Sequence, residues 1–134
     1  MTKTLIIAEK PSVAQDIVRA LTPVAGKFDK QADHFGPLVE IRAPEECDAR
    51  RGKWSFNPLP VIPPHFDLAP IDKAKSRLSA VVKLVKRKDV TDLINACDAG
   101  REGELIFRLF VQYAGSEKKP IDKPIRRLWL QSMT

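Results

Sequence analysis

The sequence predicts an α/β fold with a mainly parallel sheet and helices on both faces. Short apolar, β-branched runs alternate along the chain with longer stretches of helical periodicity, which is typical of such sheets. A length of 134 residues and a hydrophobic content of 43% suit one domain with a sizeable core. No apolar run approaches the roughly 20 residues of a membrane span, so we expect no membrane association.

The first half of the chain predicts one strand–turn–helix unit followed by irregular segments. Thr4-Leu5-Ile6-Ile7-Ala8 has the composition of a short buried strand. Ser12 with Gln15 forms a capping box, so we expect the first helix to begin there. The apolar stripe of that helix consists of Val13, Ile17, Val18 and Leu21. The prolines clustered between residues 43 and 70 predict a proline-rich extended insertion, because proline interrupts regular helix.

The second half predicts two helices and two strands in alternation. We expect a helix from about Ile71 to Lys88, a buried strand over Leu93–Cys97 and a helix from about Glu102 to Tyr113. A last strand is expected over Ile125–Leu130. Tyr113, the only tyrosine, lies on the apolar stripe of its helix, so we interpret it as a core residue and not as a nucleophile.

The most informative stretch is Asp98-Ala99-Gly100-Arg101-Glu102-Gly103-Glu104, which places three carboxylates between a strand and a helix. Such a turn lies at the carboxyl end of a parallel strand, where open α/β sheets bind their ligands. Crowded carboxylates repel each other unless a cation lies between them, and oxygen ligands suit Mg²⁺. The alternative is structural, because acids in the first turn of a helix also complement its dipole. This stretch alone favours neither interpretation.

A second predicted strand also ends in an acid. The run that begins at Thr4 is followed directly by Glu9 and Lys10. If the two strands are neighbours, Glu9 joins Asp98 and Glu102 around one cation, and Lys10 lies close enough to hold a phosphate. We therefore predict that the strand before Glu9 and the strand before Asp98 are adjacent in the sheet.

The order strand–Glu–helix, then strand–Asp-x-x-x-Glu–helix, resembles the Toprim domain shared by topoisomerases and primases. The strings Ile7–Ser12 and Asp98–Glu104 look like those of bacterial topoisomerase III, a type IA DNA topoisomerase. Arg127–Ser132 is similar to the strand that closes that domain. The resemblance spans essentially the whole chain. It implies a Toprim (Rossmann-like) fold for a single domain, residues 1–134, that ends before the tyrosine-bearing domains.

The resemblance also implies roles for individual residues. Glu9 would transfer the proton, and Lys10 would stabilise charge on the scissile phosphate. Glu9, Asp98 and Glu102 would hold Mg²⁺. Three further residues would orient the site or contact DNA: Arg101, Glu104 and Arg127. The implied protein is an ATP-independent enzyme of the bacterial cytoplasm and nucleoid that acts on single-stranded DNA with its remaining domains. This fragment alone is expected to be inactive, because the cleavage tyrosine is absent.

Two departures from the family pattern change these expectations. Many Toprim proteins carry Asp-x-Asp where this chain has Asp98-Ala99-Gly100, so we expect one metal ion and not two. Relatives also carry a longer, strand-containing segment where Phe35 here runs directly into Gly36. We therefore expect a segment to be missing near Phe35–Gly36, and the sheet to be one strand short if the deletion is real.

Two other functions remain open from the sequence. A Toprim-type nuclease or primase would use the same acids without a tyrosine, although the strings around Lys10 and Arg127 favour a topoisomerase. A non-catalytic nucleic-acid-binding fragment would suit the net charge of +6. The segment 50–54 places basic residues beside Trp54, a combination that can bind a single strand by charge and stacking. We favour the other interpretation, a solvated loop with Trp54 packed onto the core.

Overall fold

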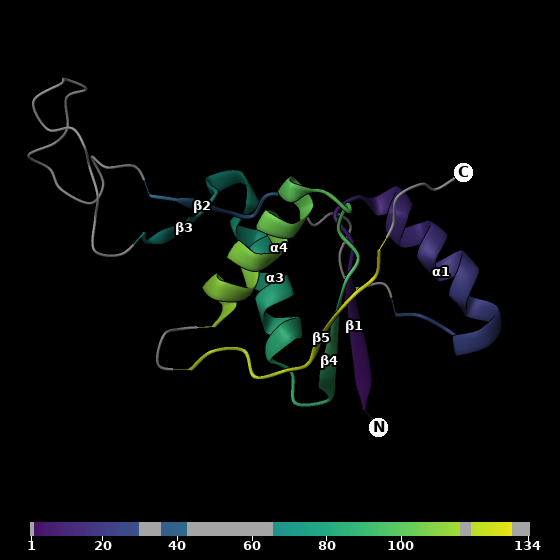
Figure 1. Ribbon diagram of the computed structural model, residues 1–134. Helices are drawn as coiled ribbons and strands as arrows, with labels where there is room; N and C mark the ends of the chain where they lie inside the picture. The colour runs from purple at the N-terminus through teal and green to yellow at the C-terminus, as the bar shows by residue number, and fades with distance from the viewer. Residues whose placement is uncertain (1, 30–35, 43–65, 116–118, 130–134) are drawn as a thin grey trace, which may run out of the picture.

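The computed structural model describes residues 2–29, 36–42, 66–115 and 119–129 (Figure 1). Helices and strands alternate along these residues as the sequence pattern predicts. In chain order the elements are β1 (Lys3–Ile7), α1 (Pro11–Ala25), β2 (Val39–Ile41), β3 (Leu68–Pro70), the 3-10 turn η2 (Asp72–Ala74), α3 (Lys75–Lys86), β4 (Val90–Asn95), α4 (Arg101–Ala114) and β5 (Ile125–Arg127).

The described strands β1, β4 and β5 form a parallel sheet in the order β1-β4-β5. Ile7 lies opposite Asn95, and Asn95 lies opposite Arg127, so the three strands end side by side. Figure 1 shows α1 on one side of this sheet and α3 with α4 on the other. The predicted fold class and the adjacency of the two acid-bearing strands are therefore confirmed.

The hydrophobic core lies mainly between the sheet and the α3–α4 pair. Phe107 and Phe110 from α4, Val85 from α3 and Leu93 from β4 are completely buried. On the other side of the sheet, Ile17 is the buried residue of α1, a helix that is described over its full length. Among the described residues, the side of the sheet covered by α3 and α4 therefore buries more apolar side chains than the side covered by α1.

A two-stranded ribbon projects beside this core. β2 pairs antiparallel with β3, with Val39 opposite Pro70, and β2 contacts α4. β3 is an extended segment of the predicted proline-rich insertion, and the rest of that insertion lies outside the described residues. The basic segment 50–54 and the predicted break at Phe35–Gly36 also fall at least partly outside them.

Some predicted boundaries are wrong. The first helix begins at Pro11, with Lys10 in an extended conformation as its N-cap, and no described side chain caps it. Ser12 therefore does not form the predicted capping box, because a proline at the first helical position already has the required φ and needs no partner for a backbone N–H. The predicted helix from Ile71 begins instead as the turn η2. No helix in the described residues is long and apolar enough to cross a membrane.

Candidate metal and phosphate site

The two predicted acid-bearing loops meet at the carboxyl edge of the sheet. β1 leads into Glu9 and Lys10, β4 leads into Asp98, and these two strands are hydrogen-bonded neighbours. Lys10 Nζ lies 2.8 Å from Asp98 Oδ2 and donates a hydrogen bond to it. A single contact thus joins two turns that are 88 residues apart in the sequence.

The charges of all three predicted acids act on the Lys10 ammonium. Its pKa is raised above the ordinary lysine value of 10.5, first by the hydrogen bond that it donates to Asp98 and then by the charge of that carboxylate. The charges of Glu9 and Glu102 raise the pKa further. Lys10 is therefore protonated at neutral pH. Because about half of its side chain is exposed, water screens the ion pair.

The donor set suits a hard divalent cation. Glu9, Asp98 and Glu102 offer only carboxylate oxygens, the ligands that Mg²⁺ prefers. A cationic group, the Lys10 ammonium, already lies within the field of these three acids. Within the described ranges, however, no three His, Cys, Asp or Glu side chains are arranged as a metal site. A metal ion at this edge would compete with Lys10 for Asp98.

The turn that carries Asp98 is held from two sides. The Asp98 carbonyl oxygen accepts hydrogen bonds from Gly100 N at 2.8 Å and from the Arg127 guanidinium at 2.7 Å. Gly103, in the first turn of α4, packs directly against the same peptide. A Cβ at Gly103 would lie 2.4 Å from the Asp98 carbonyl oxygen, a distance that real Cβ atoms do not adopt. Glycine at this position therefore allows α4 to approach the turn.

A polar network links β4, α4 and β5 behind this turn. Asn95 is 2% exposed; its amide donates to Glu104 Oε2 at 3.0 Å and accepts from Cys97 N at 3.1 Å. Glu104 also accepts a hydrogen bond from Arg108 Nε at 2.7 Å. Arg127 NH1 lies 3.5 Å from Glu104, at ion-pair distance. Sequence reasoning missed Asn95, although a lone amide in an apolar strand was the available signal, because a buried polar group needs partners.

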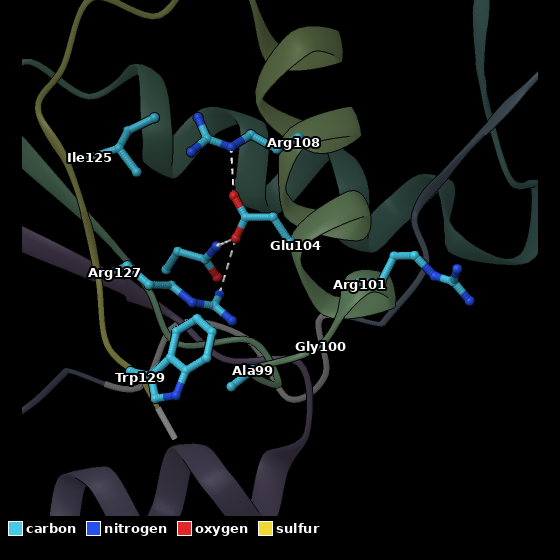
Figure 2. Close-up of a pocket in the computed structure, with 9 residues that line it drawn as sticks. Ala99, Gly100, Arg101, Glu104, Arg108, Ile125, Arg127 and Trp129 are labelled. Atoms are coloured by element: carbon cyan, nitrogen blue, oxygen red, sulfur yellow. Dashed lines mark hydrogen bonds and ion pairs between the residues drawn. The ribbon is translucent and has the colours of Figure 1, made fainter. Parts of the chain in front are cut away.

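A pocket of about 480 Å³ lies over this network (Figure 2). Figure 2 shows Arg127 and Trp129 together at one end of it and Arg108 with Glu104 at the other, while the Arg101 side chain points away from them. Of the predicted site residues, three line this pocket, namely Arg101, Glu104 and Arg127. The acids Glu9, Asp98 and Glu102 do not line it. The predicted residues thus form two adjoining groups.

Cys97 lies buried beneath the two turns as a free thiol. Burial raises its pKa to about 12, and the charge of Glu9 acts in the same direction. The thiol is therefore neutral at physiological pH and unreactive as a nucleophile.

Comparison with known proteins identifies the family. The Toprim domain matches residues 4–133 of this chain. The DNA topoisomerase 3 of Bacillus cereus is 39% identical over 146 residues, which cover 100% of this chain and 19% of the relative. The DNA topoisomerase 3 of Staphylococcus saprophyticus is 40% identical over 139 residues, covering 98% of this chain and 19% of the relative. The chain thus spans about a fifth of the length of these curated relatives.

The alignment lengths also bear on the predicted deletion. The Bacillus cereus alignment is 146 residues long and covers all 134 residues of this chain, so the relative carries 12 residues in this span that the chain lacks. A shorter chain is what the predicted missing segment requires, although its position at Phe35 lies outside the described residues. The family match covers nearly the entire chain, and the matched region includes both acid-bearing strands and the closing strand β5. The chain belongs to the Toprim domain family.

Proposed function

We propose that this chain is the Mg²⁺-binding catalytic domain of a type IA DNA topoisomerase. Such an enzyme cleaves, passes and rejoins single DNA strands without ATP, using a tyrosine that a domain downstream of this one would supply. The single observation that carries the proposal is the Lys10–Asp98 contact, since it unites the two acid-bearing turns at one edge of the sheet. The family and the relatives named DNA topoisomerase 3 support the reaction class.

In this proposal the two turns divide the chemistry. Glu9 exchanges the proton between the tyrosine hydroxyl and the DNA hydroxyl released by cleavage. Lys10, protonated at neutral pH because of its carboxylate neighbours, stabilises the negative charge on the scissile phosphate. Glu9, Asp98 and Glu102 hold one Mg²⁺, which supplies positive charge at the reacting phosphate when bound. Gly100 offers no ligand, so a second firmly held metal ion is not expected.

The second group of residues supports the first in this scheme. Arg127 fixes the Asp98 carbonyl, and Glu104 ties Arg127 to Arg108 and Asn95. Arg101 lies at the start of α4 and extends away from this network, where it is available to DNA. We further propose that the substrate is single-stranded DNA in the bacterial cytoplasm, at the nucleoid.

Binding of Mg²⁺ tests the proposal directly. A ligand at ten times its dissociation constant stabilises a fold by about 1.4 kcal/mol, which raises the melting temperature of a domain of this size by a few degrees. We expect that shift in the wild-type chain and its near loss in Asp98→Asn. Asp122→Asn is the matched control, because this exposed carboxylate precedes β5 at the opposite edge of the sheet. An equal response in Asp98→Asn and the wild type would leave only the structural interpretation of these acids.

Incubation with single-stranded DNA separates the enzyme classes. The chain should bind such DNA weakly and in a salt-sensitive way, but leave it uncut in Mg²⁺ because it contributes no cleavage tyrosine. Metal-dependent cleavage that Asp98→Asn abolishes would assign the domain to the Toprim nucleases. The readout is the length of an end-labelled oligonucleotide on a denaturing gel.

A further inference from the structure

The pocket over the Asn95–Glu104 network has an aromatic wall. Trp129 is 63% exposed, which leaves most of a large apolar ring in contact with water. The Arg127 guanidinium carbon lies 5.8 Å from the centroid of that ring, so the indole is held in place by a cation–π contact. Figure 2 shows the ring beside Ala99 at one end of the pocket. This is a platform on which a flat group can stack.

The pocket lining carries unbalanced positive charge, with Arg127 at the Trp129 end and Arg108 at the other end. Glu104 is the one carboxylate among the pocket-lining residues, and it is shared between the guanidinium groups of Arg108 and Arg127. Arg101 also lines the pocket but its side chain points away, so two positive charges face one negative charge. Arg127 Nε and NH1 are buried and make no hydrogen bond in the described part of the chain, so the Arg127 guanidinium adds positive charge near the pocket without offering these atoms to an entering group. The exposed Arg108 guanidinium can contact an anion directly. The pocket consequently attracts an anion.

The space between the two ends is open. Its volume of about 480 Å³ falls in the range of small-molecule pockets, roughly 300–1,000 Å³. Gly100 lines it, and a Cβ at Gly100 would meet no described atom within 4 Å. A flat ring and an attached anionic group can therefore enter together.

We propose that this pocket is a subsite for one nucleotide of a single-stranded DNA, whose base stacks on Trp129 while its phosphate is held at Arg108. Base stacking on an aromatic side chain tolerates any sequence, which suits an enzyme that acts on single strands. The inference rests on the proposed function in taking DNA as the substrate. The proposed subsite places DNA-binding side chains beside the acids. It gives Trp129 and Arg108 roles that the sequence did not suggest.

The test separates the base from the phosphate. Fluorescence anisotropy at low salt would measure the binding of a labelled oligothymidylate and of an abasic oligomer of the same length. Trp129→Ala should weaken binding of the thymidylate about tenfold, as expected for one stacked base, and leave binding of the abasic oligomer unchanged. Trp129→Phe should retain most of the affinity. Arg108→Gln should weaken the binding of both oligomers by the same factor. It should also reduce the dependence of the affinity on salt by the equivalent of about one phosphate contact.

Phe66→Ala is the matched control, because Phe66 is also an exposed aromatic residue, beside β3 and away from the pocket. The subsite is overturned if Trp129→Ala binds the thymidylate as tightly as the wild type does. It is also overturned if Trp129→Ala lowers the affinity for the abasic oligomer by the same factor, or if Phe66→Ala lowers the affinity for the thymidylate as much as Trp129→Ala does. It is also overturned if the wild type binds neither oligomer, or binds an oligouridylate tenfold more tightly than the thymidylate.

These outcomes are distinguishable from failure of the proposed catalytic site. The Mg²⁺-induced shift in melting temperature depends on Asp98 and is measured without DNA. A normal Mg²⁺ response without the Trp129 effect removes only the nucleotide subsite. A Trp129 effect without the Mg²⁺ response removes only the catalytic assignment.

Discussion

The two strand–turn–helix units of this domain carry similar acids but are held very differently. In the β4–α4 unit, the Asp98 carbonyl is fixed by Arg127 and by Gly100, and Gly103 packs against the same peptide. Behind it, α4 buries Phe107 in the core. This unit is a rigid platform, because its backbone, its polar network and its apolar face are all anchored.

In the described part of the chain, the β1–α1 unit has fewer anchoring contacts. Its turn is tied by a backbone hydrogen bond from Gly36 N to Glu9 O at 3.2 Å and by the exposed Lys10–Asp98 ion pair. The helix buries Ile17 and leaves Val18 and Val24 exposed. The proposed proton-transfer and phosphate-binding residues therefore lie on the less firmly held unit, whereas Asp98 lies on the rigid one. Segments that adapt to ligands are commonly those of lower local stability.

Core truncation is expected to show the largest difference between the two units. Phe107→Ala should lower the free energy of unfolding by about 3–5 kcal/mol, because it removes a completely buried ring. Val24→Ala in α1 should change it by less than about 0.5 kcal/mol, because Val24 is 81% exposed. Urea denaturation measures both. Equal losses would show that α1 is as firmly anchored as α4.

The two glycines of the Asp98 turn offer the next test. Gly103→Ala should destabilise the domain by about 2–3 kcal/mol, since the steric conflict with the Asp98 backbone exceeds the gain of about 1 kcal/mol from alanine in a helix. Gly100→Ala should be nearly neutral, because its φ of −137° suits any residue and the space around it is open. Thermal and urea unfolding would compare them. A tolerated Gly103→Ala would contradict the close approach of α4 to the turn.

Loss of the Lys10–Asp98 contact between the two units should have a smaller effect, a change in the affinity for Mg²⁺. Lys10→Met removes the ammonium that occupies Asp98, so the affinity for Mg²⁺ should rise by about three- to tenfold as competition and repulsion disappear. Calorimetric titration measures the affinity. Lys88→Met is the control, because that exposed lysine lies just before the amino end of β4, at the opposite end of the strand from Asp98. An unchanged affinity in Lys10→Met would place the metal away from Asp98.

The smallest expected effect is a pH dependence of the same contact. Because the folded chain raises the pKa of Lys10, the ion pair stabilises the fold fully below the ordinary lysine value of 10.5. That contribution is lost as the pH rises through the higher pKa of the folded state. The stability of Lys10→Met should therefore differ in slope from the wild type only in this alkaline window. Urea unfolding across that pH range provides the measurement, and a difference in slope near neutral pH would contradict it.

The local pattern of this sequence was enough to predict the main elements and the acid-bearing turns. Apolar runs and helical periodicity placed β1, β4, α3 and α4 to within a few residues, because these features depend on each segment alone. The adjacency of β1 and β4 was also predictable, since both strands end in acids and the predicted common cation requires the two strands to be neighbours. The helix start was not, because Pro11 overrode the capping pattern of Ser12.

Local sequence features encode the fold class and the identity of the acids and the lysine at the strand ends. The partners of these residues depend on how the whole chain packs. Whether Asn95 would meet Glu104, or Arg127 the Asp98 carbonyl, depends on which strand lies beside β4 and in which register. The pocket beneath Trp129 arises in the same way, from β4, α4 and β5 together. Contacts between distant segments follow from packing of the whole chain, and no local pattern encodes them.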